Sequence, residues 1–311
     1  MSSFFCYAIM FFLASWGLAG FRGRSALRPH NLGLMGEAGI DFGGYLIDHE
    51  VGRGGHATVY RARDSRLRAD HAPPVALKVL DEAHRTSAEQ ARLNREFEFA
   101  RVLDHPHVVT VYRHGPCWLA MQFIDGGNST RLQTLPDRLR ALAQIADALD
   151  YAHHSGIVHC DVKPANILIA ADFPRAGAVL TDFGSAHAVV EDVGNRPRIP
   201  GNPEVSLPYT APEILCGKAP SAATDEYALA CTAVELLTGA PPFPASSAAE
   251  LVDAHLRRLP PPVPAAFGPA ARALDVVVER AMAKLPARRY DSCTELVEQL
   301  SRVLVERDSE T

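Results

Sequence analysis

The sequence predicts an α+β fold of two lobes, with a small β-rich lobe near residues 45–124 and a larger, mostly helical lobe near residues 128–305. Short runs rich in β-branched and aromatic residues, separated by Gly or Pro clusters, are concentrated in the first region. After residues 125–127, DGG, long segments with helical periodicity dominate. With 311 residues, 47% hydrophobic and 22% charged, the chain is long enough for two cores.

The N-terminus opens with an apolar stretch, residues 4–21, that carries no charge. Its length approaches the roughly 20 residues that span a bilayer. Arg22, Arg24 and Arg28 follow, and by the positive-inside rule they would keep the rest of the chain in the cytoplasm. The alternative is that translation starts at Met35, which gives a cytoplasmic protein without an anchor. Both interpretations stay open; we expect residues 1–21 as the apolar segment, 22–44 as a linker, 45–305 as the folded domain and 306–311 as a tail.

Charge and cysteine content exclude some classes of function. The formal net charge of −5 offers no electrostatic case for a nucleic-acid partner, since backbone binding needs a basic surface. The six cysteines are scattered without a C-x-x-C pair, which is typical of reduced thiols in a cytosolic protein rather than of a disulfide framework or zinc site.

The elements of the first lobe are predicted from alternation and turn residues, and those of the second from helical periodicity. The helix of the first lobe carries Leu93, Phe97 and Ala100 on one stripe. A Pro-rich segment, 259–269, connects two later helices. We expect strands at 45–51, 57–64, 74–80, 108–115 and 117–124, and helices at 87–104, 135–156 and 224–239.

A Gly-rich turn, VGRGGHATVY at 51–60, joins the first two strands. Gly52 and Gly54 would let the backbone approach phosphate oxygens, which a Cβ would obstruct. A plain β-turn is the alternative. A dinucleotide-binding motif is excluded because a strand rather than a helix follows, and Ala57 stands at the third glycine position.

Lys78 lies in an apolar strand, VALKVL, where burial without a partner would be costly. It could instead be an edge-strand lysine that extends to water. If Lys78 binds phosphate it needs an acid, and we expect an ion pair with Glu96 of the following helix. Glu98 is the competing acid, on a different face of that helix.

The segment HCDVKPANIL, 159–168, holds three groups suited to phosphoryl transfer. Asp161 could orient or deprotonate a hydroxyl, Lys163 could neutralise the transferring phosphate, and Asn166 could bind a metal ion. One strand later, LTDFGSA places Asp182 at a strand end as a candidate Mg²⁺ ligand, and Gly184 permits a sharp turn.

A further pair of charges is predicted far from these motifs. Glu213, in LPYTAPEIL, is flanked by apolar residues and needs a partner, for which Arg289 in LPARRYDS is the candidate. The alternative is that both are solvated surface charges.

In this order, these motifs resemble the signature set of the protein kinases, and the chain is similar to the bacterial, eukaryotic-like (Hanks-type) serine/threonine protein kinases over about residues 45–303. The resemblance implies the bilobal protein-kinase fold, with Mg²⁺ and ATP in the cleft between lobes and Ser/Thr hydroxyls of protein substrates as acceptors. It implies Asp161 as the base, Lys163 as a mark of Ser/Thr specificity, and Asn166 and Asp182 as Mg²⁺ ligands. ATP would contact Val51, Gly52, Gly54, Val59, Ala76, Lys78 (held by Glu96), Met121, the backbone of 122–124, and Leu168.

Structural roles are also implied. Asp225 would brace the catalytic loop, and the Ser206 hydroxyl would contact the catalytic Asp; His159, Glu213 and Arg289 complete the set of expected structural residues.

Two departures from the family pattern concern regulation. Cys160 replaces the Arg that in many members pairs with a phosphorylated activation-loop residue. No Ser, Thr or Tyr lies between Ser185 and Ser206. We therefore hypothesise that activity does not need activation-loop phosphorylation.

The main rival interpretation is a pseudokinase or scaffold, which predicts loss of at least one of Lys78, Asp161, Asn166 and Asp182; all are present. A membrane receptor would need an extracellular domain, and the A-P-E segment at 211–213 argues against a small-molecule kinase. The sequence does not indicate the protein substrate, the regulator or the oligomeric state.

Overall fold

The computed structural model of the chain describes residues 41–68, 72–188 and 206–305. The predicted apolar segment, almost all of the linker, most of the 185–206 loop and the tail therefore lie outside the described residues. Within the described ranges no helix is both long enough and apolar enough to cross a membrane.

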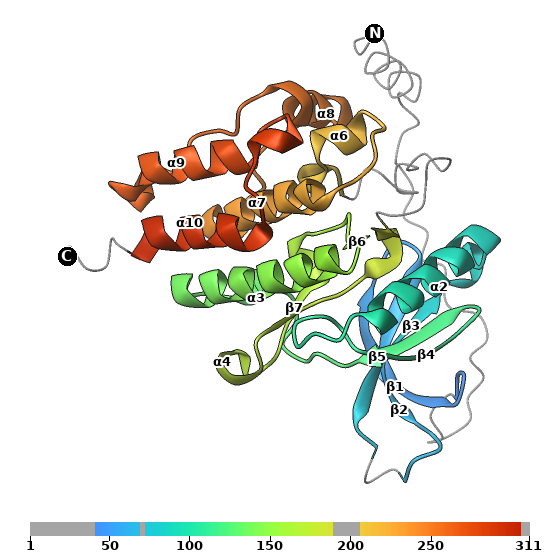
Figure 1. Ribbon diagram of the computed structural model, residues 1–311. Coiled ribbons are helices and arrows are strands. Elements are labelled where there is room, and N and C mark those ends of the chain that lie inside the picture. The colour runs from blue at the N-terminus through green and yellow to red at the C-terminus, as the bar shows by residue number, and fades with distance from the viewer. Residues whose placement is uncertain (1–40, 69–71, 189–205, 306–311) are drawn as a thin grey trace.

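The small lobe is built on one five-stranded antiparallel sheet with the strand order β1-β2-β3-β5-β4 (Figure 1). Helix α2 (Ser87–Val102) packs against it. The hydroxyl of Thr86 caps this helix by accepting the N–H of Glu89. The strands are β1 Tyr45–Arg53, β2 Ala57–Asp64, β3 Pro74–Leu80, β4 Val111–Gly115 and β5 Trp118–Gln122.

Alternation along β3 decides which side chains reach the site. Val75, Leu77 and Val79 belong to a small cluster on one face of the sheet. Ala76 and Leu80 face the main core, which continues into the large lobe. Because side chains alternate across a strand, Lys78 lies on the same face as Ala76 and Leu80.

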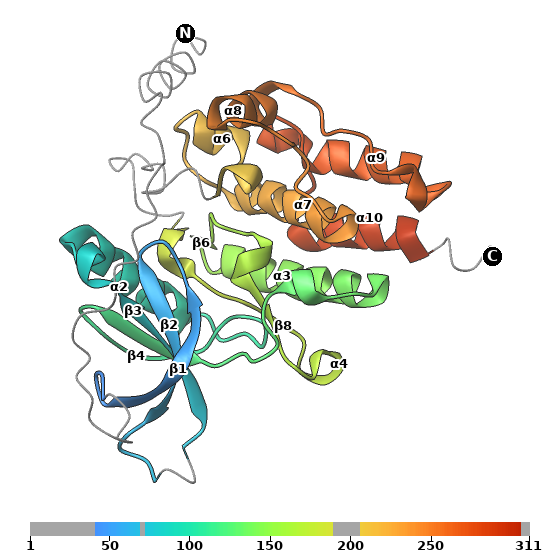
Figure 2. The same cartoon turned by 180° about the vertical axis from the view of Figure 1, so that it is seen from behind.

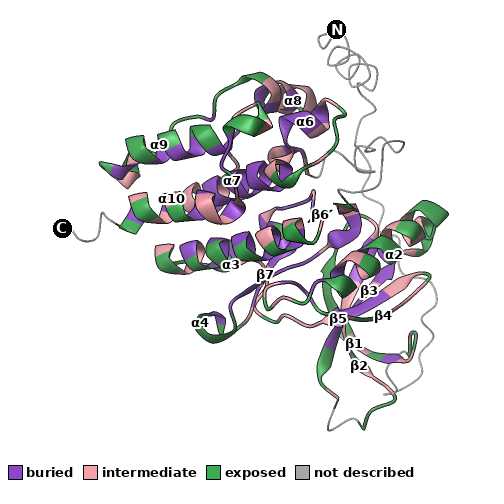
Figure 3. Cartoon of the chain, viewed as in Figure 1, coloured by how far each residue is buried: buried purple, intermediate pink, exposed green. Residues whose placement is uncertain are grey.

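The large lobe is helical and centres on α7 (Ala222–Thr238), which is buried along nearly its whole length (Figure 3). Helices α3 (Leu135–His154), α9 (Ala270–Ala281) and α10 (Cys293–Val305) pack around it, and α10 also packs along α3 (Figure 2). The remaining α-helices are α4 Phe173–Ala176, α6 Pro212–Leu215 and α8 Ala248–Arg257.

Short elements carry the residues between α3 and α6. Strands β6 (Ile157–Val158) and β9 (His187–Ala188) form one ribbon, and β7 (Ile167–Ile169) and β8 (Ala178–Leu180) form another. The described residues also contain single-turn 3₁₀ helices: η1 Glu82–His84, η2 Ser129–Arg131, η3 Pro164–Asn166, η4 Phe183–Ser185, η5 Leu207–Tyr209, η6 Ala265–Phe267 and η7 Pro286–Arg288.

The α+β class and the two-lobed architecture are confirmed, while some predicted boundaries were wrong. The strand predicted from residue 108 begins only at Val111, because Val108 and Val109 pair instead with Leu180 of β8. The helix predicted to residue 104 ends at Val102, where Leu103 takes an extended conformation.

Candidate active site

A cavity of about 750 Å³ lies between the two lobes, within the size range of small-ligand sites. Its walls come from the β1–β2 turn, β3, α2, the residues after β5, the 161–168 segment and the start of η4. It brings together every residue predicted to bind ATP, metal or the acceptor hydroxyl: Val51, Gly52, Gly54, Val59, Ala76, Lys78, Glu96, Met121, Asp161, Lys163, Asn166, Leu168 and Asp182, with Ser206 beside them.

The Gly-rich turn forms the roof of this cavity. A Cβ built on Gly52 would meet no heavy atom within 4 Å, and one on Gly54 would reach only the carbonyl oxygen of Ala57, at 3.6 Å. Contacts within the described protein therefore do not require glycine at these two positions. The free space beside the backbone is instead what close approach of a phosphate needs.

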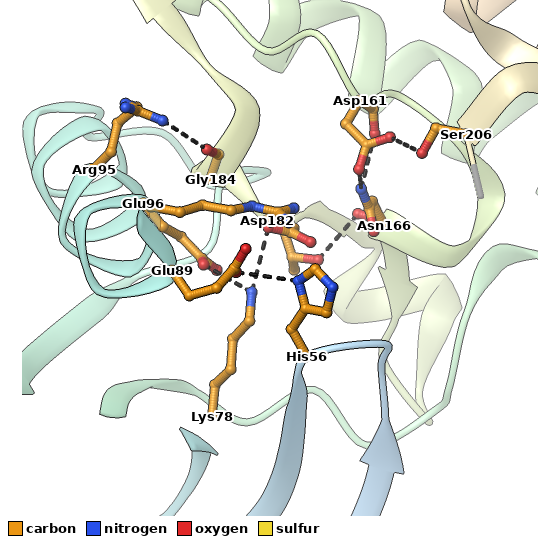
Figure 4. A network of polar contacts seen from close by, with 12 residues as sticks. His56, Lys78, Glu89, Arg95, Glu96, Asp161, Asn166, Asp182, Gly184 and Ser206 are labelled. Atoms are coloured by element: carbon orange, nitrogen blue, oxygen red, sulfur yellow. Dashed lines mark hydrogen bonds and ion pairs between the residues drawn. The ribbon is translucent and has the colours of Figure 1, made fainter. Parts of the chain in front are cut away.

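Lys78 makes the predicted ion pair with Glu96, since Nζ lies 2.7 Å from Oε2 (Figure 4). The competing acid, Glu98, pairs with Arg101 on the exposed side of α2. The same Nζ lies 3.3 Å from Oδ1 of Asp182. Burial alone lowers the pKa of Lys78, but the charges of Asp182 and Glu96 outweigh it and raise the pKa above its ordinary value. Lys78 is thus a permanent cation at the back of the cavity.

Asp182 sits at a sharp turn with φ of 66°, in the left-handed region that is unfavourable for a residue with a Cβ. Burial favours its neutral form, yet Lys78 and then Arg92 hold the pKa of this carboxyl below its usual range. At Gly184, a Cβ would approach the Arg92 side chain to 3.0 Å, so a larger residue there would have to displace the Arg92 side chain of α2.

Asp161 is surrounded by donors. Lys163 Nζ lies 2.8 Å from Oδ2, and the Ser206 hydroxyl donates to Oδ1 at 2.8 Å. The amide of Asn166 donates to the backbone oxygen of Asp161 at 2.8 Å and to Oδ2 at 3.1 Å. These bonds fix the carboxylate in one orientation toward the cavity (Figure 4).

Asp225 of α7 holds the backbone of the 159–168 loop, which carries Asp161. The two carboxylate oxygens of Asp225 accept the N–H groups of His159 and Cys160, both at 2.7 Å. His159 is fully buried, and its Nε2 contacts the carbonyl oxygen of Thr181 at 3.0 Å. The bracing predicted for Asp225 is therefore present, and His159 connects this loop to the turn that carries Asp182.

Glu213 and Arg289 form a buried bidentate ion pair, with N–O distances of 2.8 and 2.7 Å. The predicted pairing is confirmed, and the surface alternative is wrong. Thr224 adds a hydroxyl donor to Glu213, and Arg289 also donates to the carbonyl oxygen of Ala283. The pair lies outside the cavity and ties α6 to η7.

Asn166 and Asp182 fit a hard divalent cation such as Mg²⁺, which prefers oxygen ligands. The amide nitrogen of Asn166 is committed to Asp161, which leaves its side-chain oxygen as the ligand. The lowered pKa keeps Asp182 ionised at neutral pH. Both side chains border the same cavity, as a shared metal ion requires.

Sequence reasoning missed several polar residues that contact this site. Glu89 pairs with His56 at the tip of the Gly-rich turn at 3.2 Å, and Arg92 lies 3.9 Å from Asp182. Arg95 donates to the carbonyl oxygen of Gly184 at 3.4 Å. Glu89 and Arg92 could have been predicted from the sequence, because they are spaced three and four residues along the helix that also carries Glu96. Residues at this spacing are neighbours on one helix face.

Comparisons with known proteins agree with this geometry. A family model described as a protein kinase domain matches residues 45–303. The serine/threonine-protein kinase PknJ of Mycobacterium tuberculosis is 39% identical over 202 residues, covering 61% of this chain and 33% of that protein. PknF of the same organism is 38% identical over 206 residues, covering 61% and 42%. This chain thus spans less than half the length of these two relatives.

Among solved structures, the kinase domain of Mycobacterium tuberculosis PknI is similar, with a TM-score of 0.63 and 30% sequence identity. The match covers 87% of this chain and 99% of that one.

Proposed function

Because the chain belongs to the protein kinase domain family, we propose that it transfers the γ-phosphate of ATP to Ser or Thr hydroxyls of protein substrates. The observation that carries this proposal is the convergence of Lys78, Asp161 and Asp182, from three separate segments, on one cavity. A cation that can neutralise phosphate, a carboxylate held in one orientation and a second carboxylate able to hold a metal ion are the parts that phosphoryl transfer needs.

The chain's own residues supply binding, orientation and proton transfer. Gly52 and Gly54 cover the phosphates, and Lys78 neutralises the nucleotide's charge. The acceptor hydroxyl gives its proton to Asp161 as its oxygen bonds to the γ-phosphorus, and the bond from that phosphorus to the bridging oxygen of ADP breaks. Lys163, 2.8 Å from Asp161, is close enough to offset charge on the transferring group. Mg²⁺, held by Asn166 and Asp182, would neutralise phosphate charge.

The alternative is a pseudokinase that binds nucleotide without efficient transfer. Asp161→Asn keeps the size of the side chain but removes its capacity to accept a proton, so we expect phosphate transfer from labelled ATP to fall by at least about 100-fold. Nucleotide binding, measured by fluorescence or calorimetry, should be retained. Equal transfer by Asp161→Asn and wild type would instead support the scaffold function.

We further infer that activity is independent of activation-loop phosphorylation. Cys160 offers no cation for a loop phosphate, and the hydroxyl of Ser206 is engaged with Asp161 and Lys163. Phosphatase-treated protein, checked by mass spectrometry, should keep its full rate. A required, stoichiometric phosphate within residues 184–211 would overturn this inference.

We propose that the kinase domain works in the cytoplasm on protein substrates and not on nucleic acid, in keeping with the net charge of −5 of the full sequence. Anchoring through residues 4–21 remains a separate hypothesis. Cell fractionation combined with N-terminal sequencing distinguishes a chain that starts at Met1 from one that starts at Met35.

A further inference from the structure

A histidine outside the cavity, His153, lies between a fully buried carboxylate, Asp225, and a partly buried one, Asp150, which belong to different helices. It is in the last turn of α3, and its side chain is only 10% exposed. Nε2 contacts Oδ2 of Asp225 at 2.8 Å, and Nδ1 lies 3.8 Å from Oδ1 of Asp150. His153 does not line the cavity, so binding of a ligand there does not explain its position.

The first carboxylate, Asp225, holds the backbone of the catalytic loop in place. It is fully buried on α7 and holds the backbone N–H groups of His159 and Cys160. Cys160 has φ of 66°, a conformation that a residue with a Cβ rarely adopts unless its surroundings impose it. Whatever fixes the charge and orientation of Asp225 therefore fixes the backbone directly before Asp161.

The second carboxylate, Asp150, holds the start of α10. Its two oxygens accept the N–H groups of Cys293 and Thr294, each at 2.9 Å. These are first-turn N–H groups, which have no partner within their own helix. His153 is thus the only side chain described that contacts both the carboxylate under the catalytic loop and the carboxylate that caps α10.

The charges around His153 favour its protonated form. Burial alone would lower its pKa, but the hydrogen bonds and charges of Asp150 and Asp225 raise the pKa to about 9. The facing group on α10 is the thiol of Cys293, whose own pKa is raised well above its usual value, first by burial. The environment is therefore two anions from α3 and α7 and one neutral thiol.

A metal ion is the competing explanation, since ligand atoms of Asp150, His153 and Cys293 lie within 4.8 Å of one another. The bonding argues against it. Nε2 of His153 already contacts Asp225, both oxygens of Asp150 accept backbone N–H groups, and zinc would need a deprotonated thiol.

We propose that His153 is a positioning residue that acts as a cation, joining Asp225 to Asp150 so that the catalytic loop and the first turn of α10 are held as one unit. The consequence for catalysis rests on the function proposed above, whereas the charge of His153 and its effect on the loop do not.

The first test compares His153→Gln with wild type by urea unfolding between pH 6 and pH 10. A pKa raised in the folded state stabilises fully below the unfolded value, near 6.5, and loses that contribution as the pH rises through about 9. We expect the ratio of unfolding constants, variant over wild type, to be on the order of 100 at pH 6, to fall progressively as the pH rises from 6.5 to 9, and to level off above pH 9. A ratio that stays constant with pH would overturn the proposal.

His154→Gln is the matched control, because it removes the neighbouring, more exposed histidine, which contacts only the Asp150 carbonyl oxygen of its own helix. Hydrogen exchange supplies a readout independent of activity. Amides of residues 159–161 should exchange at least about tenfold faster in His153→Gln and unchanged in His154→Gln. Unchanged exchange in both variants would contradict the positioning role.

Kinetics then separate this proposal from the proposed function. In an active enzyme, His153→Gln should lower kcat and leave the KM for ATP nearly unchanged, since His153 does not line the cavity. An unchanged kcat would overturn the catalytic part. If wild type transfers no phosphate, the proposed function fails, while pH-dependent stability and loop exchange still test His153.

Should His153→Gln not fold, titration of the wild type by NMR replaces it. One imidazole should titrate near pH 9, and Asp150→Asn should move that midpoint down while leaving the other imidazoles in place. Zinc or EDTA should leave the melting temperature unchanged. Stabilisation by zinc that Cys293→Ser abolishes would show a neutral metal ligand and would refute the cationic role.

Discussion

At the scale of single residues, several buried or half-buried charges of this protein pair with a side chain of opposite sign, among them Lys78, Asp161 and Glu213. Lys78 is the most consequential, because it contacts a helix, through Glu96, and the turn that bears Asp182.

Lys78→Met should therefore reduce kcat/KM by at least about 100-fold, as loss of a preorganised electrostatic contact does. Lys218→Met, at an exposed position, should leave the rate unchanged. Steady-state assays over a range of ATP concentrations that extends well below KM check both, and a deficit below tenfold for Lys78→Met would contradict its role.

Arg289 supports a prediction about stability rather than rate. Removing it leaves the Glu213 carboxylate buried and without its counter-ion, so Arg289→Ala should lower the free energy of unfolding by about 3–5 kcal/mol. Arg288→Ala, at the exposed neighbour, should change it by less than about 0.5 kcal/mol. Chemical denaturation measures both; equal effects would mean that the pair contributes nothing specific.

The residues that could be predicted from the sequence were those whose charge conflicts with their own neighbours. Lys78 in an apolar strand and Glu213 in an apolar segment each required a partner, and the partners predicted from the sequence, Glu96 in the following helix and Arg289 in LPARRYDS, are the ones found. His153 could not be distinguished in this way. His154 beside it is the same residue type, and only the rotation of α3 against α7 decides which of the two meets Asp225.

At the scale of elements, α2 coordinates three parts of the site from one face. Glu89 contacts His56 of the Gly-rich turn, Arg92 approaches Asp182, and Glu96 holds Lys78. The spacing of three and four residues aligns these side chains. A displacement of this one helix would therefore disrupt its contacts with His56, Asp182 and Lys78 together.

The contact between Glu89 and His56 is open to a direct test. Glu89→Gln should weaken closure of the Gly-rich turn and raise the dissociation constant for ATP by up to about fivefold, the range of a partly exposed ion pair. Glu98→Gln alters another acid of the same helix that pairs only with Arg101, and should leave the constant unchanged. Isothermal titration calorimetry at fixed Mg²⁺ compares the ATP affinities of the two variants and wild type. Equal affinities of Glu89→Gln and wild type would contradict a role of the Glu89–His56 contact in closing the turn.

Element prediction succeeded where local patterns decide and failed where long-range pairing does. β3 was correctly bounded because alternation and flanking turn residues both marked it. Val108 and Val109 carry the same β-branched pattern as a strand, yet they pair with Leu180, which is more than seventy positions away in the sequence. No local signal contains that information. The lengths of α2 and β4 therefore had to come from tertiary structure.

At the scale of the whole molecule, the site exists only where the lobes meet, since Lys78 and Asp182 come from different lobes and lie 3.3 Å apart. Lys78 already pairs with Asp182, so a cation that binds this carboxylate would share it with Lys78. A bound metal-nucleotide complex would thus connect both lobes, and binding should be visible as global stabilisation.

This gives a prediction for the intact chain. ADP with Mg²⁺ at about 100 times its dissociation constant should stabilise the folded state by about 2.7 kcal/mol, or roughly 5–10 °C in Tm. Asp182→Asn removes the ionised metal ligand, so its stabilisation by ADP should become insensitive to Mg²⁺, while stabilisation by ADP alone persists through the Gly-rich turn and the adenine cavity. Differential scanning calorimetry with Mg²⁺ or EDTA measures the four combinations. In the Asp182→Asn variant, both proposed metal-binding side chains, at positions 166 and 182, are neutral amides. Neither of them then offers a negative charge to the cation. A magnesium effect of equal size in wild type and Asp182→Asn would place the metal ion elsewhere and would remove the central premise of the site.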